Sequence, residues 1–180
     1  GDALRVLPNL IPEYLIPNTK YKLVGNIPYY ITGKLLRVLG ELDEKPELIV
    51  LTLQREVAER LAAEPPRMNL LAAATQIWSK PSILGYLKPK DFQPAPEVES
   101  TIIKLVPKPF TLDPAPYYRL IKVIFKQPRK TLLNNLSTGL NKPKEEVLKV
   151  MISMGLKGTE RPQNLNVGTI QKLSQKLFTF

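Results

Sequence analysis

The stretch NIPYY, which begins at Asn26, combines residue types that together could bind an exocyclic amine. Pro28 has a fixed φ and favours an extended conformation at Ile27, so the turn that they form is stiff. The side-chain oxygen of Asn26 and the carbonyl oxygen of Ile27 can then act as two acceptors for the two N–H donors of an amine. The ring of Tyr29 offers a flat face on which a base can stack. The stretch therefore predicts a binding site for an adenine amino group, which we call the amine seat. The alternative is an ordinary turn that ends a strand, with both tyrosines packed in the core.

A second aromatic candidate is Phe92, which lies between Asp91 and two prolines in a polar loop. A phenylalanine on a loop stiffened by prolines is unusual for core packing, so we predict a second stacking face. The alternative is a side chain that caps a domain edge. Tyr30 could be a further stacking group or a packing residue, and of the two we predict that it packs against the protein. The chain has no His and no Cys, so its chemistry must proceed without imidazole or thiol, and no carboxylate cluster predicts a metal site.

Hydrophobic patterning predicts the elements that position these residues. Alternating strands and helices in the first hundred residues are typical of parallel βαβ units, and only helices follow residue 107. The last two strands are joined without a helix, which predicts an antiparallel pair at the sheet edge. Asn26 falls at the carboxyl end of a strand, where open α/β sheets bind ligands. The predicted strands are residues 21–25, 47–53, 82–88 and 98–106, and the predicted helices are residues 31–40, 54–63, 69–78, 115–127, 129–140, 143–154 and 167–178.

Side chains within the predicted helices also have expected roles. Glu59 and Glu56 lie at helical spacing from Arg55 and Arg60, which predicts surface ion pairs rather than an acid–base dyad. Trp78 ends an apolar helical pattern and is predicted to be part of the core.

The net charge of +10 is confined to the end of the chain. Residues 1–100 hold 12 Lys/Arg and 12 Asp/Glu, whereas residues 101–180 hold 14 Lys/Arg and 4 Asp/Glu. This asymmetry favours a core domain joined to a segment that binds a polyanion, with a solvated basic surface as the alternative. No apolar run is long enough to span a membrane and no signal sequence opens the chain, so we expect a cytoplasmic protein. Predicted phosphate contacts form a basic cluster that consists of Lys122, Lys126, Arg129 and Lys130.

Five stretches resemble one known family, in the order in which that family has them. NIPYY is similar to motif IV of the ribosomal RNA adenine N6-dimethyltransferases, and GDAL at the start resembles motif III. Residues 54–61 (QREVAERL) resemble the helix after the next strand, and residues 92–100 (FQPAPEVES) its F-x-P-x-P-x-V-x-S loop. Residues 125–136 (FKQPRKTLLNNL) resemble the basic start of its helical domain. The YYIT sequence and the helical tail are most similar to the kasugamycin-sensitivity methylase type.

The resemblance implies an enzyme that converts two adjacent adenines of small-subunit rRNA to dimethyladenosine with S-adenosylmethionine. Asp2 would bind the adenine of the cofactor, and Asn26 would contact the cofactor and accept from the target N6. Tyr29 and Phe92 would stack on the flipped base, with Ile27 and Pro28 completing the catalytic motif. The partner would be small-subunit rRNA or the immature small ribosomal subunit. We expect a monomer without a metal.

The implied fold is α/β: a partial Rossmann-like methyltransferase sheet with its N-terminal strands missing, followed by a small all-α domain. Residues 1–108 would be the C-terminal part of the catalytic domain, and residues 109–180 a basic helical rRNA-binding domain. The family's glycine-rich motif I and acidic motif II have no counterpart here, so the chain resembles the C-terminal two-thirds of such a protein. We therefore expect the chain alone to bind S-adenosylmethionine poorly and to be inactive, although its parent is an enzyme.

Two other functions use the same features. A non-catalytic rRNA-binding or ribosome assembly factor could keep the scaffold, and a DNA adenine methyltransferase could use a related amine seat. Intact Asn26, Pro28, Tyr29 and Phe92 favour the enzyme, because a pure binder has no need of such a seat. The basic helical tail and the NIPYYIT sequence favour rRNA over DNA.

Overall fold

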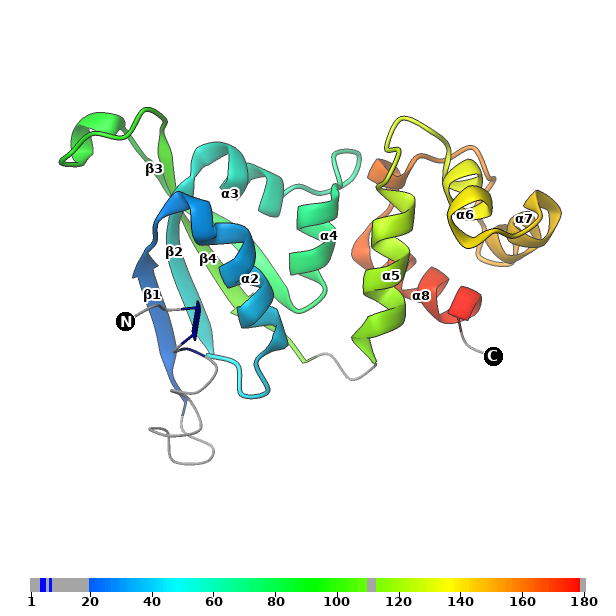
Figure 1. Ribbon diagram of the computed structural model, residues 1–180, viewed down its shortest axis with the longest axis horizontal. Helices are drawn as coiled ribbons and strands as arrows, with labels where there is room; N and C mark the ends of the chain where they lie inside the picture. Colours follow the sequence, from blue (N-terminus) through cyan, green and yellow to red (C-terminus); the bar gives the residue numbers. More distant parts are fainter. Residues whose placement is uncertain (1–3, 6, 8–19, 110–112, 179–180) are drawn as a thin grey trace. The chain divides into compact units, whose positions relative to one another are not determined.

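In the computed structural model the chain forms two compact units (Figure 1). The residues that the structure describes are 4, 5, 7, 20–109 and 113–178. The first unit comprises the described residues of Gly1–Ala62 and Trp78–Pro109, and the second those of Ala63–Ile77 and Phe110–Phe180.

The first unit contains a four-stranded sheet in the order β1-β2-β4-β3. β1 and β2 are parallel, whereas β4 is antiparallel to both of its neighbours, β2 and β3. The predicted antiparallel pairing of the last two strands is therefore confirmed. The carboxyl ends of β1, β2 and β3 and the start of β4 lie at the same end of the sheet. We call this end of the strands the site edge. The strands are β1 (Lys22–Asn26), β2 (Leu48–Gln54), β3 (Ser79–Leu87) and β4 (Ser100–Pro107).

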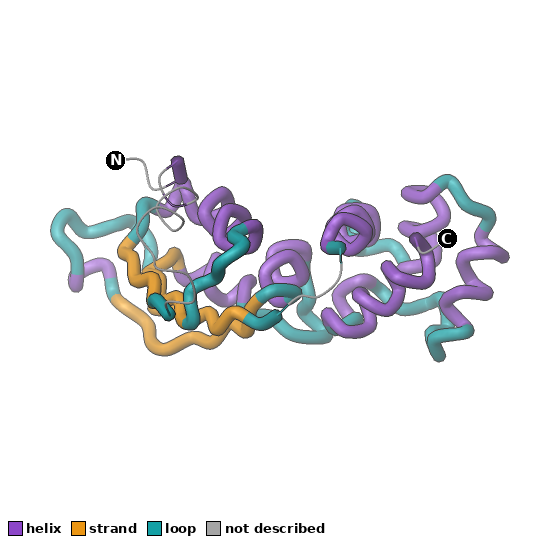
Figure 2. The backbone as a smooth tube through the Cα atoms, turned by 90° about the horizontal axis from the view of Figure 1, so that it is seen from below, coloured by secondary structure: helices purple, strands orange, loops and turns teal. Residues whose placement is uncertain are grey.

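The core of this unit lies on one face of the sheet. Helices α2 (Thr32–Glu41) and α3 (Arg55–Leu61) both lie on that face (Figures 1 and 2). Successive side chains of a strand point to opposite faces, and in β2 the residues that face the helices, Ile49, Leu51 and Leu53, are fully buried. The alternate residues of β2 are only partly buried. The predicted core position of Trp78 is confirmed, because this side chain is 3% exposed.

The second unit is helical, and side chains mark where its helices begin. Asn69, Asp113 and Thr131 each precede a helix and accept a hydrogen bond from a main-chain N–H in its first turn.

Within the described residues, no helix is both long and apolar enough to cross a membrane. The helices of the second unit are α4 (Leu70–Gln76), α5 (Pro114–Ile124), α6 (Leu132–Leu140), α7 (Lys144–Ile152) and α8 (Val167–Phe178). The short 3-10 turns among the described residues of both units are η1 (Tyr29–Ile31), η2 (Pro89–Asp91) and η3 (Pro162–Asn164).

The segment between α5 and α6 is longer than the sequence pattern predicted. The predicted helices met near residue 128, but α5 ends at Ile124 and α6 begins at Leu132. Pro128 explains the difference, because it has no N–H to donate and disfavours a helical conformation at the residue before it. The separated segment contains three of the four residues of the basic cluster.

Helix α4 belongs to the second unit through two tyrosines of α5. The hydroxyl of Tyr117 donates to the carbonyl oxygen of Ala73 (3.0 Å), and that of Tyr118 to the carbonyl oxygen of Ala74 (3.3 Å). Burial raises the pKa of Tyr117, so its hydroxyl stays protonated and can donate. The boundary predicted at residue 108 placed α4 in the first domain, whereas the structure groups residues 63–77 with the second unit.

Tyr117→Phe is expected to lower the free energy of unfolding of the second unit by about 1–2 kcal/mol, because it removes the donor to a buried carbonyl. Tyr117 is 1% exposed, so solvent cannot replace the lost hydrogen bond. Tyr118→Phe is the matched control, since its longer hydrogen bond is only partly buried. Urea unfolding of both variants measures the difference. Equal losses for the two tyrosines would contradict the importance of burial.

Candidate active site

Asn26 ends β1 at the site edge, and its side chain is exposed. It pairs in register with Thr52 of β2. The preceding Gly25 is tightly packed, because a Cβ there would lie 3.2 Å from Cγ2 of Ile27 and the Ile27 side chain would have to shift to accept it. Among the hydrogen bonds formed by the described residues, none uses the amide of Asn26. The carbonyl and amino groups of this amide are therefore both available to a ligand.

Tyr29 connects the turn after β1 to the start of β4. Its side chain is half-buried in η1, and its Oη lies 2.6 Å from Oγ of Ser100. Ser100 is fully buried, so this hydrogen bond fixes the tyrosine ring at the site edge. Tyr30 points away, and 89% of it is exposed. The prediction that Tyr30 packs was wrong, because successive side chains of a 3-10 turn point in directions about 120° apart.

Phe92 lies in the connection between β3 and β4, also at the site edge. It follows η2 and is half-buried. The turn before it is braced: Lys88 donates its main-chain N–H to Oδ2 of Asp91 (2.8 Å), and Phe92 donates its own to the carbonyl of Pro89 (3.2 Å). The structure thus places Asn26, Tyr29 and Phe92 at one edge of one sheet. That their side chains converge on a single cleft stays a prediction.

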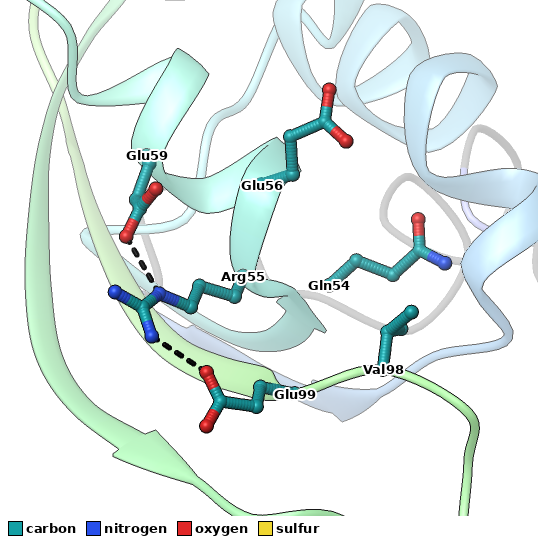
Figure 3. A pocket seen from close by; sticks show the side chains of 6 residues that line it. All are labelled: Gln54, Arg55, Glu56, Glu59, Val98 and Glu99. Atoms are coloured by element: carbon teal, nitrogen blue, oxygen red, sulfur yellow. Dashed lines mark hydrogen bonds and ion pairs between the residues drawn. The ribbon is translucent and has the colours of Figure 1, made fainter.

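A cavity of about 340 Å³ also opens at the site edge (Figure 3). It is formed where β2 passes into α3 and where the chain approaches β4, and it has the size of a small ligand site. Asn26, Tyr29 and Phe92 do not line it, so the sequence prediction missed this cavity. Its lining residues are Gln54, Arg55, Glu56, Glu59, Val98 and Glu99.

Arg55 beside the cavity is held by carboxylates. Its Nε lies 2.8 Å from Glu59 and its Nη1 lies 2.6 Å from Glu99. The hydrogen bonds to Glu59 and then Glu99 raise the pKa of Arg55 further above its ordinary value. Arg60 and Glu56 are 3.7 Å apart, so the predicted surface pairs along α3 are confirmed. The Glu99 contact spans 44 residues, and no helical spacing could have indicated it.

All four residues of the basic cluster are exposed in the second unit. Lys122 lies in the last turn of α5, and the other three lie in the segment between α5 and α6. Asn135 of α6, 6% exposed, donates from Nδ2 to the carbonyl oxygens of Gln127 (3.0 Å) and Thr131 (3.2 Å). This buried amide, which the sequence prediction missed, shapes the segment. A polar residue within the apolar pattern of a helix was the available signal.

Asp2 and Asn26 are the residues predicted to contact the cofactor. Asp2 lies outside the residues that the structure describes. The exposed, unengaged amide of Asn26 fits a contact to a polar cofactor, since it offers one acceptor and two donors. In the described ranges, no three His, Cys, Asp or Glu side chains are grouped so that they could hold a metal ion.

Comparison with known proteins identifies the family. A family model described as ribosomal RNA adenine dimethylase matches residues 6–176. The chain belongs to this family. The resemblance to the dimethylase family that the sequence indicated is therefore confirmed.

Curated relatives in the dimethylase family are about one-third identical to the chain over the aligned residues. A ribosomal RNA small subunit methyltransferase A of Dehalococcoides mccartyi is 36% identical over 171 residues, which cover 93% of this chain and 58% of the relative. The protein of the same name from Geobacillus kaustophilus is 31% identical over 188 residues, which cover 98% of this chain and 64% of the relative. The chain thus spans about three-fifths of the length of these relatives.

Solved structures of dimethylase relatives have the same fold. A dimethyladenosine transferase from Plasmodium falciparum matches with a TM-score of 0.76 and 24% identity, over 89% of this chain and 67% of that one. The 23S rRNA methyltransferase ErmE matches with a TM-score of 0.67 and 22% identity, over 90% of this chain and 67% of that one. The predicted fold class is confirmed: a Rossmann-like methyltransferase sheet with a helical part.

Proposed function

We propose that the dimethylase containing this chain transfers methyl groups from S-adenosylmethionine to two adjacent adenines of small-subunit rRNA. The observation that carries the proposal is the free amide of Asn26 at the carboxyl end of β1, inside the NIPY sequence. The family assignment supports rRNA adenine as the substrate, as does the name shared by the relatives.

In this proposal the chain's own residues bind and orient the target amine. The side-chain oxygen of Asn26 and the carbonyl oxygen of Ile27 accept the two N6–H donors, which favours a tetrahedral nitrogen with a more available lone pair. Tyr29, held by Ser100, stacks on the base, and Phe92 provides the opposite face. Alignment of the reactants carries most of the catalysis, so the absence of His and Cys is no obstacle.

S-adenosylmethionine, when bound, supplies a methyl group on a positively charged sulfur. Asp2 and Asn26 are the residues proposed to contact it. The family's glycine-rich motif I and acidic motif II have no counterpart in this sequence, so we propose that these two residues alone hold the cofactor weakly.

The second unit is proposed to bind the RNA. Its basic cluster is exposed, and cationic side chains that contact phosphates position RNA without reading its sequence. The proposed partners are small-subunit rRNA and the immature small subunit, and we propose a cytoplasmic monomer.

A methyl-transfer assay with the full-length protein separates this proposal from its alternatives. The assay offers immature small subunits, free rRNA and duplex DNA as substrates, with labelled cofactor. We expect label in the small subunits, at two adjacent adenines when the RNA is digested and examined by mass spectrometry. Binding to subunits without transfer would instead identify an assembly factor, and label in duplex DNA a DNA methyltransferase.

A further inference from the structure

The guanidinium of Arg55 joins three segments of the first unit. Its Nε donates to Oε1 of Glu59 within α3 (2.8 Å), and its Nη1 donates to Oε2 of Glu99 just before β4 (2.6 Å). Its Cζ lies 4.9 Å from the centre of the Tyr86 ring on β3. Figure 3 shows the guanidinium between the two carboxylates, turned away from Gln54. One side chain therefore links α3, β3 and the start of β4.

The link from Arg55 continues to the ring of Tyr29. The main-chain N–H of Arg55 donates to the carbonyl oxygen of Glu99 (2.9 Å). Both the main chain and the side chain of Arg55 are therefore hydrogen-bonded to Glu99. The next residue, Ser100, is fully buried, and its Oγ lies 2.6 Å from Oη of Tyr29. A displacement of Glu99 must move Ser100, and with it the hydroxyl of Tyr29.

The surroundings of Arg55 do not favour a contact with RNA phosphate. Its donors already face two carboxylates, and the cavity beside it is lined by three glutamates and a single arginine. The resulting negative charge repels phosphate groups. We therefore infer that the Arg55 side chain interacts with groups of the protein and not with RNA.

We propose that Arg55 is a positioning residue that, through Glu99, holds Ser100 and Tyr29 in place for the target base. This inference rests on the proposed function. Lysine cannot substitute, because an ammonium group is a point charge that lacks the planar fork needed to bridge two carboxylates and stack on Tyr86. About half of each charged side chain is exposed, and exposed ion pairs contribute little to stability. Loss of Arg55 should therefore leave the fold intact.

The chain offers a closely matched control. Arg37 of α2 donates from Nε to Oε1 of Glu41 at 2.8 Å, with the same atoms, distance and spacing as Arg55 and Glu59. In the full-length enzyme, Arg55→Ala is expected to lower kcat about 10- to 100-fold, as misplacement of reactive groups does. The KM for rRNA should stay within about twofold, because no phosphate contact is lost. Arg55→Lys should recover little of the rate, and Arg37→Ala should match the unchanged enzyme.

Two further measurements make the test independent of the proposed function. Hydrogen exchange at residues 98–101 should quicken in Arg55→Ala and not in Arg37→Ala, whether or not the protein methylates RNA. Arg55→Ala combined with Glu99→Gln should lose no more activity than either single change, because both break one link. Unchanged exchange, additive losses, or a raised KM with an unchanged kcat would each overturn the inference. If the unchanged protein transfers no methyl group, the proposed function fails, and hydrogen exchange alone decides the role of Arg55.

Discussion

Asn26→Ala in the full-length protein should lower the rate of methyl transfer to small-subunit rRNA by about 10²- to 10³-fold, the usual cost of removing one preorganised hydrogen-bonding group. The side-chain amide is exposed at the end of β1 and is free among the described residues, so the change leaves no buried group unsatisfied. RNA affinity should stay within about twofold, because phosphate contacts set most of it. Single-turnover transfer and filter binding measure the two quantities separately.

Val24→Ala is the control for Asn26→Ala. Val24 lies on the same strand and the same face, two residues earlier, and is 77% exposed. It should show unchanged transfer, which would attribute the loss at position 26 to the amide rather than to the strand. A rate for Asn26→Ala within about threefold of the unchanged enzyme would refute the amine seat, since a lost hydrogen-bonding group at the reacting atom costs far more.

Replacement of the whole basic cluster by Gln should make rRNA binding much less sensitive to salt. Each phosphate contact contributes about −0.7 to the slope of log K against log salt for single strands, so loss of four contacts should flatten the slope by about 3. All four side chains are exposed, and Asn135 holds the main chain of their segment from the protein side. The fold of the segment should therefore survive the replacement. Binding isotherms at several salt concentrations give the slope.

A matched variant controls for net charge. Lys144, Lys149, Lys172 and Lys176 are four exposed lysines of the same unit, and their replacement by Gln removes the same charge. This variant should flatten the slope by less than about 1, because these lysines make none of the proposed contacts. Equal slopes for the two variants would mean that only the overall charge of the unit matters, and the cluster would lose its proposed role.

The strands and helices could be predicted from sequence because their patterning is local. β2 reads as an apolar run, and η2 fell inside a segment already predicted as a loop from its prolines. The exception was the junction of α5 and α6, where the two predicted helices ended on either side of Pro128, whereas α5 ends at Ile124 and α6 begins only at Leu132.

The sequence indicated which residues could form the candidate site but not the hydrogen bonds that connect them. NIPY and Phe92 stood out because prolines that stiffen a turn, and aromatic residues next to them, are visible in sequence. The contacts that hold them were not, because Tyr29 and Ser100 are 71 residues apart and Arg55 and Glu99 are 44 apart. Pairs of this kind form only once β4 inserts beside β2, so no local spacing can indicate them.

The hydrogen bonds of the Asn135 amide fix the backbone of the basic segment without involving the side chains on its surface. The Asn135 side chain is buried and donates to main-chain carbonyl oxygens. Every amino acid has such a carbonyl, so these hydrogen bonds do not depend on which side chains the segment carries. The outward side chains can therefore change between lysine, arginine and glutamine over evolutionary time without altering the path of the backbone. In the proposed RNA-binding role, such changes would alter the affinity for RNA and its dependence on salt, whereas loss of the Asn135 amide would alter the segment itself.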